Sequence, residues 1–239
     1  MSDPLPPVPE KHHRDVQGGA ARAAVFGVSD GLVSNVAIVL GFAGANPGPG
    51  LVRLAGLAGL IGGAVSMAAG EYVSMTAQAE LLERELEMER LELRRRPEAE
   101  RRELAQIYRS RGVDEDTAEQ LAAALSQDPD LALQTHAREE LGIDPDSLGE
   151  PVKAALSSFV TFSVGASIPL VPYFFATGTA ALTAAVVLGV LAALAVGAFL
   201  ARFTGRPMGR SAGRQLLFSA VPAAITYAIG SAVGVTGIG

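Results

Sequence analysis

The stretch Ser66-Met67-Ala68-Ala69-Gly70-Glu71-Tyr72 joins two kinds of sequence without a break. Before it lies an apolar block long enough to cross a bilayer, and after it comes a Glu-rich pattern with helical spacing from residue 80 to residue 92. No proline separates the two. The stretch therefore predicts one helix that begins in a membrane and continues into water.

Four further apolar blocks accompany this one. The chain has 239 residues, of which 49% are hydrophobic, and these gather into blocks rather than spreading evenly. The five blocks cover residues 22–43, 54–75, 154–176, 180–203 and 215–234. Each has about 20 residues or slightly more, enough to cross roughly 30 Å of hydrocarbon. The predicted fold class is an all-α membrane protein with five transmembrane helices and a cytoplasmic helical insert between the second and third.

The charge of the chain is concentrated in that insert. Residues 80–150 hold 20 acidic and 10 basic residues, whereas the rest of the chain holds 5 and 9. Basic residues near span ends favour the cytoplasmic side, and they cluster before span one and between spans four and five. The leader, the insert and the Arg-rich connection are therefore expected in the cytoplasm.

Glycine and proline residues indicate where the predicted helices approach one another, bend or end. Gly27/Gly31, Gly59/Gly63 and Gly230/Gly234 each have small-residue spacing that lets membrane helices approach closely, although such spacings arise easily in a chain rich in Ala and Gly. Pro169 and Pro172 should kink or interrupt span three near its outer end. In the insert, Pro97 should end the long helix, and three further helices are predicted over 98–110, 114–126 and 128–141.

One acidic residue of span one and a polar stripe on span two are candidates for ion handling. Asp30 lies well within span one, where a carboxylate is expensive and marks an ion or proton pathway by default. One face of the second helix carries Met67, Glu71, Ser74 and Gln78. Together they would form a path of ligands from the membrane interior towards water. The plainer interpretations are that Met67 fills the core, that Glu71 anchors the helix at the interface and that a protonated Asp30 bonds a neighbouring helix.

The insert offers pairs of ligand residues at helical spacing: Glu89/Glu92, Glu100/Glu103 and His136/Glu140. Each pair can converge on a metal ion from one helix face, and carboxylates with one imidazole suit Fe(II), Mn(II) or Zn(II). Arginines are interleaved with these residues, so a solvated face with ion pairs is the default interpretation of any single Glu. The chain has no cysteine, which excludes disulfides, thiolate metal sites and cysteine catalysis.

These motifs together resemble the vacuolar iron transporter family. The resemblance rests on Asp30-Gly31, the run from Ser66 to Ser74, the Glu-rich insert and the Glu139-Glu140-Leu141-Gly142 ending, and it extends from about residue 15 to the C-terminus. It implies a homodimeric, proton-coupled exporter of Fe2+, and often Mn2+, with a cytoplasmic metal-binding domain. Asp30 and Met67 match the family's intramembrane ligands, and the matches to its cytoplasmic ligands are Glu89, Glu92, Glu100, Glu103 and Glu140.

The chain departs from the family pattern at His136-Ala137, where the family has two methionines. Imidazole replaces soft sulfur at one position and a ligand is lost at the next, which opens the metal preference to Zn(II), Ni(II) and Co(II). The complete set of candidate metal ligands is Asp30, Met67, Glu71, Glu89, Glu92, Glu100, Glu103, His136 and Glu140.

The expected function is a proton-coupled antiporter that exports Fe2+, and Mn2+ or Zn2+ in second place, and not an enzyme. The expected partners are metal ions, protons, the lipid bilayer and a second copy of the chain, with no prosthetic group and no nucleic acid. The domains would be a disordered leader (1–19), spans one and two (20–79), the acidic metal-binding insert (80–150) and spans three to five (151–239). Composition favours a prokaryotic plasma membrane.

Two other classes remain open. The first is a membrane-anchored di-iron oxidase or iron buffer, because Glu-x-x-Glu pairs on bundled helices resemble di-iron carboxylate sites. Such sites usually use Glu-x-x-His pairs, and here the single insert histidine precedes a Glu by four residues. The second is a structural protein whose insert is only a charged coiled coil.

Overall fold

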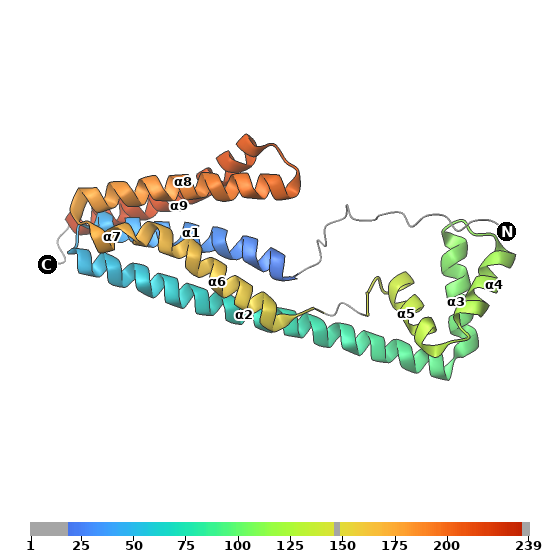
Figure 1. The fold of residues 1–239 in the computed structure, drawn as a ribbon. Helices are drawn as coiled ribbons and strands as arrows, with labels where there is room; N and C mark the ends of the chain where they lie inside the picture. Colours follow the sequence, from blue (N-terminus) through green and yellow to red (C-terminus); the bar gives the residue numbers. More distant parts are fainter. Residues whose placement is uncertain (1–18, 146–148, 236–239) are drawn as a thin grey trace, which may run out of the picture. The chain divides into compact units, whose positions relative to one another are not determined.

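The computed structural model describes residues 19–145 and 149–235, and within them every regular element is an α-helix. Residues 1–18 of the predicted disordered leader lie outside the described residues. The helices are α1 (Gly19–Gly44), α2 (Pro49–Arg95), α3 (Pro97–Ser110), α4 (Glu115–Leu125), α5 (Pro129–Glu139), α6 (Pro151–Leu170), α7 (Pro172–Phe175), α8 (Gly178–Thr204) and α9 (Met208–Val235) (Figure 1).

Five of these helices are long and apolar enough to cross a membrane, namely α1, α2, α6, α8 and α9. They coincide with the five predicted blocks, so the predicted all-α class with five spans is confirmed. The 47-residue helix α2 is continuous through the Ser66–Tyr72 stretch, as its lack of a breaking residue predicts. Span three is interrupted as expected, because α6 ends at Leu170 and the short α7 begins at Pro172.

The described chain divides into two compact units, one formed by residues up to Glu71 together with those from Val152 onward, the other by Tyr72–Pro151. In the first, which we call the apolar bundle, glycines bring helices into backbone contact. A Cβ atom on Gly31 would lie 2.2 Å from the Phe162 carbonyl oxygen, and one on Gly165 would lie 2.2 Å from that of Val28. The α1 and α6 backbones therefore touch where only glycine fits.

Glycines also allow the backbones of α1 and α9 to touch. A Cβ atom on Gly230 would lie 1.9 Å from the Gly41 carbonyl oxygen, and one on Gly234 would lie 2.6 Å from that of Ala45. Helix α2 differs, because the atoms that crowd its glycines belong to side chains, such as the Phe162 ring at Gly63. All three predicted glycine pairs thus lie at close helix contacts.

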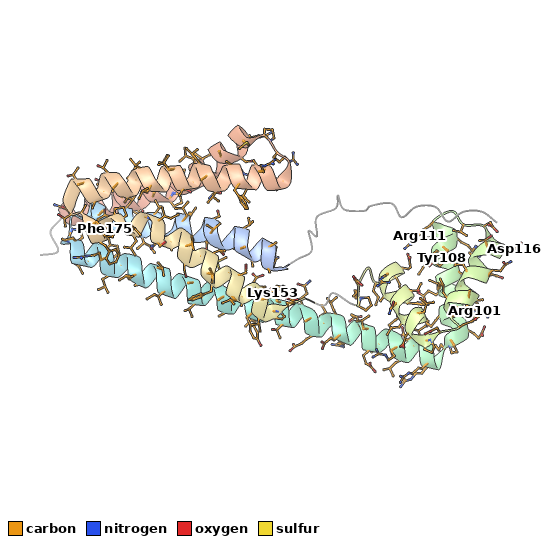
Figure 2. All side chains as sticks on the ribbon, viewed as in Figure 1. Arg101, Tyr108, Arg111, Asp116, Lys153 and Phe175 are labelled. Atoms are coloured by element: carbon orange, nitrogen blue, oxygen red, sulfur yellow. The ribbon has the colours of Figure 1, made fainter. Side chains whose placement is uncertain are left out.

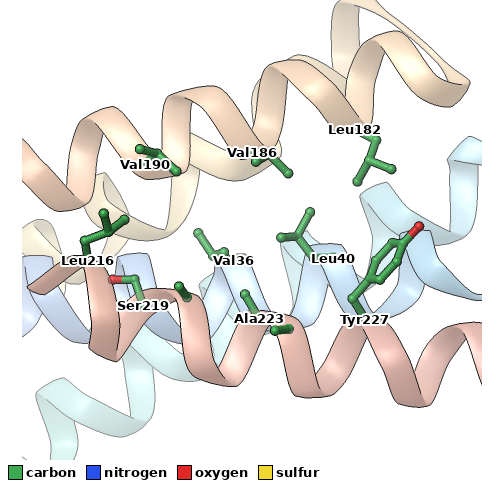
Figure 3. Close-up of a pocket in the computed structure, with 12 residues that line it drawn as sticks. Val36, Leu40, Leu182, Val186, Val190, Leu216, Ser219, Ala223 and Tyr227 are labelled. Atoms are coloured by element: carbon green, nitrogen blue, oxygen red, sulfur yellow. The ribbon is translucent and has the colours of Figure 1, made fainter.

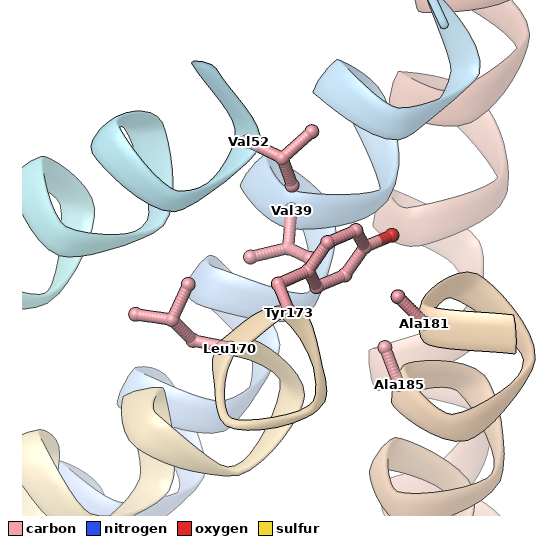
Figure 4. Packing of buried hydrophobic residues seen from close by; sticks show 6 residues of the cluster. All are labelled: Val39, Val52, Leu170, Tyr173, Ala181 and Ala185. Carbon is pink, nitrogen blue, oxygen red and sulfur yellow. The ribbon is translucent and has the colours of Figure 1, made fainter. Parts of the chain in front are cut away.

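Two of the apolar clusters between the bundle helices each join three or more helices. One joins α1, α2, α6, α7 and α8 near the α6–α7 break, where Tyr173 and Leu170 meet Val39 and Val52 (Figure 4). The other joins α1, α8 and α9 and contains Leu32, Val36, Leu40, Ala193 and Ala223. Polar side chains also link the helices here, and buried Asn35 donates a 2.5 Å hydrogen bond from Nδ2 to the Ala166 carbonyl oxygen.

The second unit, which we call the insert, is a set of short capped helices. Asp114 caps α4 by accepting a hydrogen bond from the Thr117 backbone N–H, and Asp128 caps α5 ahead of Pro129. A small core of Leu104, Ala105, Ala118 and Ala122 holds α3 against α4. Charged side chains such as Arg101 and Asp116 cover the outside of these helices (Figure 2).

Candidate metal centre

Four side chains from three insert helices converge on one point. They are Glu89 of α2, Glu100 of α3, His136 of α5 and Glu140, which is the C-terminal cap of α5. One ligand atom from each lies within 4.8 Å of those from the other three. This spacing places three carboxylates and one imidazole around a volume that a single cation could occupy.

The local sequence explains how the ligands meet. Pro97 ends α2 and starts α3, so the chain changes direction between Glu89 and Glu100. The Asp128 cap fixes where α5 starts, and one turn separates His136 from Glu140 on its last face. Arg111 then links the end of α3 to the end of α5, since its guanidinium pairs with the Glu139 carboxylate and donates a 3.0 Å hydrogen bond to the Glu139 carbonyl.

The cluster is buried to an extent that is unusual for charged groups. His136 has no exposed surface, and Glu89 and Glu100 are 3% and 6% exposed. Burial raises the pKa of Glu100, and the neighbouring carboxylates of Glu89 and Glu103 raise it further. Burial also raises the pKa of Glu140, although the hydrogen bond from His136 opposes this effect. Buried carboxylates gathered in this way are stabilised by a cation.

His136 sits between two of the carboxylates. Its Nδ1 lies 3.3 Å from Glu140 Oε2, with which it forms a hydrogen bond, and 3.1 Å from Glu89 Oε1, which forms an ion pair without hydrogen-bond geometry. Burial lowers the pKa of His136, but the two carboxylates outweigh burial and the net pKa is raised. Nδ1 thus faces two carboxylates, at a position where a divalent cation could bind.

Two atoms of the cluster have no hydrogen-bond partner. Buried Nε2 of His136 and buried Oε1 of Glu89 both lack one within the described part of the chain. Buried polar atoms usually have partners, and one that lacks them calls for a ligand or a functional reason. These two atoms are a second sign, besides the convergence of charge, that the cluster is built to bind something.

Glu92 and Glu103 were expected to bind with Glu89 and Glu100, yet both are exposed and lie outside the four-residue group. Residues three apart on a helix point about 60° apart, and the packing of the three helices leaves Glu89 and Glu100 buried while Glu92 and Glu103 are exposed. Both still raise the pKa of Glu100 through their charge, and Glu103 does the same for Glu140. They surround the cluster electrostatically without joining it.

In the apolar bundle, the candidate residues have local partners. Half-buried Asp30 accepts a 3.2 Å hydrogen bond from the Ser34 hydroxyl on its own helix. Met67 is partly buried and packs against Ala64, Phe162 and Ala166, which agrees with the core-filling interpretation. Glu71 forms a 3.0 Å ion pair with Arg22, and its side chain is 15% exposed.

Sequence reasoning missed two of these partners. Arg22 is one of the basic residues near the start of span one, and its charge, opposite to that of Glu71 near the end of span two, is the signal that could have suggested this pair. Glu139 was noted within a motif but not as the partner of Arg111. The interleaved arginines do form helical ion pairs as expected, for example Arg90 with Glu87 at 2.7 Å.

Comparison with known proteins identifies the group to which the chain belongs. The model of the VIT family matches residues 21–231. Proteins named vacuolar iron transporter are similar in sequence. One from Acanthamoeba castellanii is 38% identical over 77% of this chain and 69% of its own. Vacuolar iron transporter 1 of Eucalyptus grandis is 31% identical over 72% and 69%, and that of Arabidopsis thaliana is 31% identical over 75% and 71%.

These relatives are eukaryotic, so they lend no support to the prokaryotic origin that composition suggested. They do confirm the resemblance drawn from the motifs of the second span and the insert. Together with the five membrane-length helices, the match identifies an integral membrane protein. The chain therefore belongs to the VIT family.

Proposed function

We propose that this chain exports divalent metal ions, Fe2+ foremost, from the cytoplasm in exchange for protons. Its family is one of transporters, and it is not an enzyme. The observation that carries the proposal is the cluster of buried Glu89, Glu100 and His136 with exposed Glu140, whose ligand atoms lie within 4.8 Å of one another. The insert acts as the cytoplasmic metal-binding domain.

Competition between protons and the metal ion at the cluster supports the proposed proton coupling. The raised pKa values of Glu100, Glu140 and His136 mean that protons compete with the cation for the cluster. Metal binding then releases protons, and a rise in proton concentration favours metal release. Glu92 and Glu103 add negative charge at the exposed edge and would attract the ion.

Transfer through the membrane is assigned to the bundle. Glu71 would receive the ion when it exchanges Arg22 for a cation, and Met67 and Asp30 would bind it within the spans. Asp30 would take up a proton as the ion leaves on the far side. The protein would act as a homodimer, with its leader, insert and Arg-rich connection in the cytoplasm.

Imidazole and carboxylates support Fe2+, Mn2+ and Zn2+ alike, so the His136 ligand broadens the expected metal range. The oxidase alternative is less well supported by the geometry. A di-iron site of the bundled type draws two Glu-x-x-His motifs from two helices, whereas the described cluster contains one histidine and a single convergent point.

The test is transport by the full chain in proteoliposomes under anaerobic conditions, with lumenal metal and lumenal pH recorded together. Fe2+ uptake should be accompanied by opposite proton movement. Asp30→Asn should abolish flux, and Glu100→Gln should lower it at limiting metal concentration. Asp116→Asn, on the exposed side of α4, is the matched control and should transport like the wild type.

Two results would contradict the proposal. Unchanged flux in Asp30→Asn would remove the intramembrane carboxylate from the mechanism. Metal bound to the insert with no flux under any gradient, accompanied by oxygen consumption on Fe2+ addition, would instead favour the oxidase or buffer.

A further inference from the structure

Three arginines surround a hollow where α8 turns into α9. Arg206, Arg210 and Arg214 line a cavity of about 580 Å³ together with Pro207, Ser211, Gly213 and Leu217. Helix α8 ends at Gly205, whose left-handed backbone (φ 67°) reverses the chain, and Pro207 directly precedes α9. The tight turn therefore brings Arg206 beside the two arginines of the first turns of α9.

This arrangement concentrates positive charge that the bundle does not neutralise. Arg210 and Arg214 are four residues apart on one helix, a like-charge spacing that is unfavourable. The first turn of α9 contains no acid, and its free N–H groups already attract anions. The described part of the bundle has two acidic residues, Asp30 and Glu71, of which the first bonds Ser34 and the second pairs with Arg22.

A separate apolar groove lies farther along α9. It has a volume of about 330 Å³ and is lined by α1, α8 and α9, with Val36, Val186 and Leu216 pointing into it (Figure 3). Small residues on the facing helices, among them Gly189, Ala220 and Ala224, leave the space open. The Ser219 hydroxyl in its wall donates a hydrogen bond to the Gln215 carbonyl, so the groove offers no free donor there.

The hollow and the groove follow one another on the same helix. Gly213 of the hollow lies one turn before Leu216 of the groove, and the groove continues to Tyr227. The part of α9 from Leu216 to Tyr227 has a length of roughly 16 Å at 1.5 Å per residue. A ligand with an anionic head and a long apolar tail fits both parts.

We propose that the turn between α8 and α9 is a binding site for an anionic phospholipid, with its phosphate among Arg206, Arg210 and Arg214 and an acyl chain in the groove. The groove belongs to membrane-length helices, where hydrocarbon is the surrounding medium. Basic pockets at the ends of such helices suit lipid phosphates. A requirement for topology explains arginines in the loop but not their gathering around one hollow beside an open groove.

The site is independent of metal transport, so its test uses lipid retention. The full chain, purified in detergent, is exposed to equal amounts of dioleoylphosphatidylglycerol and dioleoylphosphatidylcholine, and the retained lipids are counted by native mass spectrometry. The wild type should prefer the anionic lipid. Each Arg→Gln change should reduce that preference about fivefold, and the triple variant R206Q/R210Q/R214Q should lose it.

The matched control is R94Q/R95Q/R96Q, which makes the same change in net charge on exposed arginines of the insert. It should retain the anionic lipid like the wild type. Equal loss in both triple variants would show a general charge effect and overturn the site. Loss of a dimer in R206Q/R210Q/R214Q, with lipid retention unchanged, would assign the arginines to a protein contact instead.

The groove is tested separately with Ala220→Phe, which fills it, and Ala228→Phe, which adds the same ring at an exposed position of α9 outside the groove. Only the first should lower lipid retention. Ala224→Leu repeats the test with a smaller side chain in case the ring disturbs folding. If soluble glycerol phosphate binds as tightly as the whole lipid, or if neither groove variant lowers retention, the acyl-chain half of the proposal is wrong.

Discussion

Replacing Glu100 by Gln should change the stability of the insert in opposite directions without and with metal. Two unit charges 4.8 Å apart repel by about 3 kcal/mol at an effective dielectric constant of 20. Glu100 faces two carboxylates and one imidazole, so roughly one such repulsion is not balanced. Partial protonation of Glu100 limits the penalty, and we expect the metal-free insert of Glu100→Gln to gain about 1–2 kcal/mol.

Bound metal should reverse the order of stability of the wild type and the variant. At a Mn2+ concentration 100 times the wild-type Kd, binding stabilises the wild type by about 2.7 kcal/mol. Losing a charged ligand should raise Kd by about 100-fold, which leaves the variant a gain of about 0.4 kcal/mol at the same concentration. The metal-loaded wild type should therefore be more stable than the loaded variant by about 0.3–1.3 kcal/mol.

Hydrogen exchange measured by mass spectrometry on the full chain, read on peptides from α3 and α5 with and without Mn2+, gives both quantities. Glu98→Gln is the control, because Glu98 is an exposed residue of the same helix whose partner is Arg101 at 2.8 Å. It should change either value by less than about 0.5 kcal/mol. A metal-free Glu100→Gln insert less stable than wild type, or one with undiminished protection by Mn2+, would refute the reasoning.

Three further outcomes follow from the same structure. The folded metal-free insert holds protons that the unfolded chain releases above pH 4.5 at glutamates and above pH 6.5 at His136, so its free energy of unfolding should fall as pH rises through these raised pKa values. Denaturation at several pH values should show the upper part of that fall missing in His136→Gln. Gly165→Ala should destabilise the bundle by about 1–3 kcal/mol or more, while Gly62→Ala, where a Cβ meets open space, should not, as thermal unfolding in detergent would show. Glu71→Gln should lower metal flux several-fold with a stability change under about 1 kcal/mol, whereas Arg22→Gln should preserve flux; equal loss in both would mean that the pair is only a structural link.

The fold was predictable because its signals are local. Block length and hydropathy indicate the spans, Pro97 and Pro172 end helices for steric reasons, and Asp128-Pro129 has the composition of a helix start. The approach of α1 to α6 and α9 was only hinted at, since a glycine pair does not specify which backbone it faces. That information depends on Phe162 and Gly41, which lie far away in the sequence.

The sequence pattern includes the four residues of the cluster, but it does not separate them from their neighbours or give their arrangement. By helical spacing alone, Glu92 and Glu103 are as good candidates for metal ligands as Glu89 and Glu100. Only the packing of the three helices determines which of them face inward. The two carboxylates that share Nδ1 of His136 come from α2 and from the end of α5. No pattern within a single helix encodes such a meeting.

The glycine contacts of α1 also determine how the bundle can deform. Backbone packed on backbone has no rotamers with which to yield, so α1, α6 and α9 are locked together where Gly31, Gly165 and Gly230 meet neighbouring carbonyls. The membrane half of α2 touches α1 and α6 through side chains, which can change rotamer and slide. Rocking of this bundle would therefore shear along α2, and Asp30 would travel with the rigid part while Met67 moves past it.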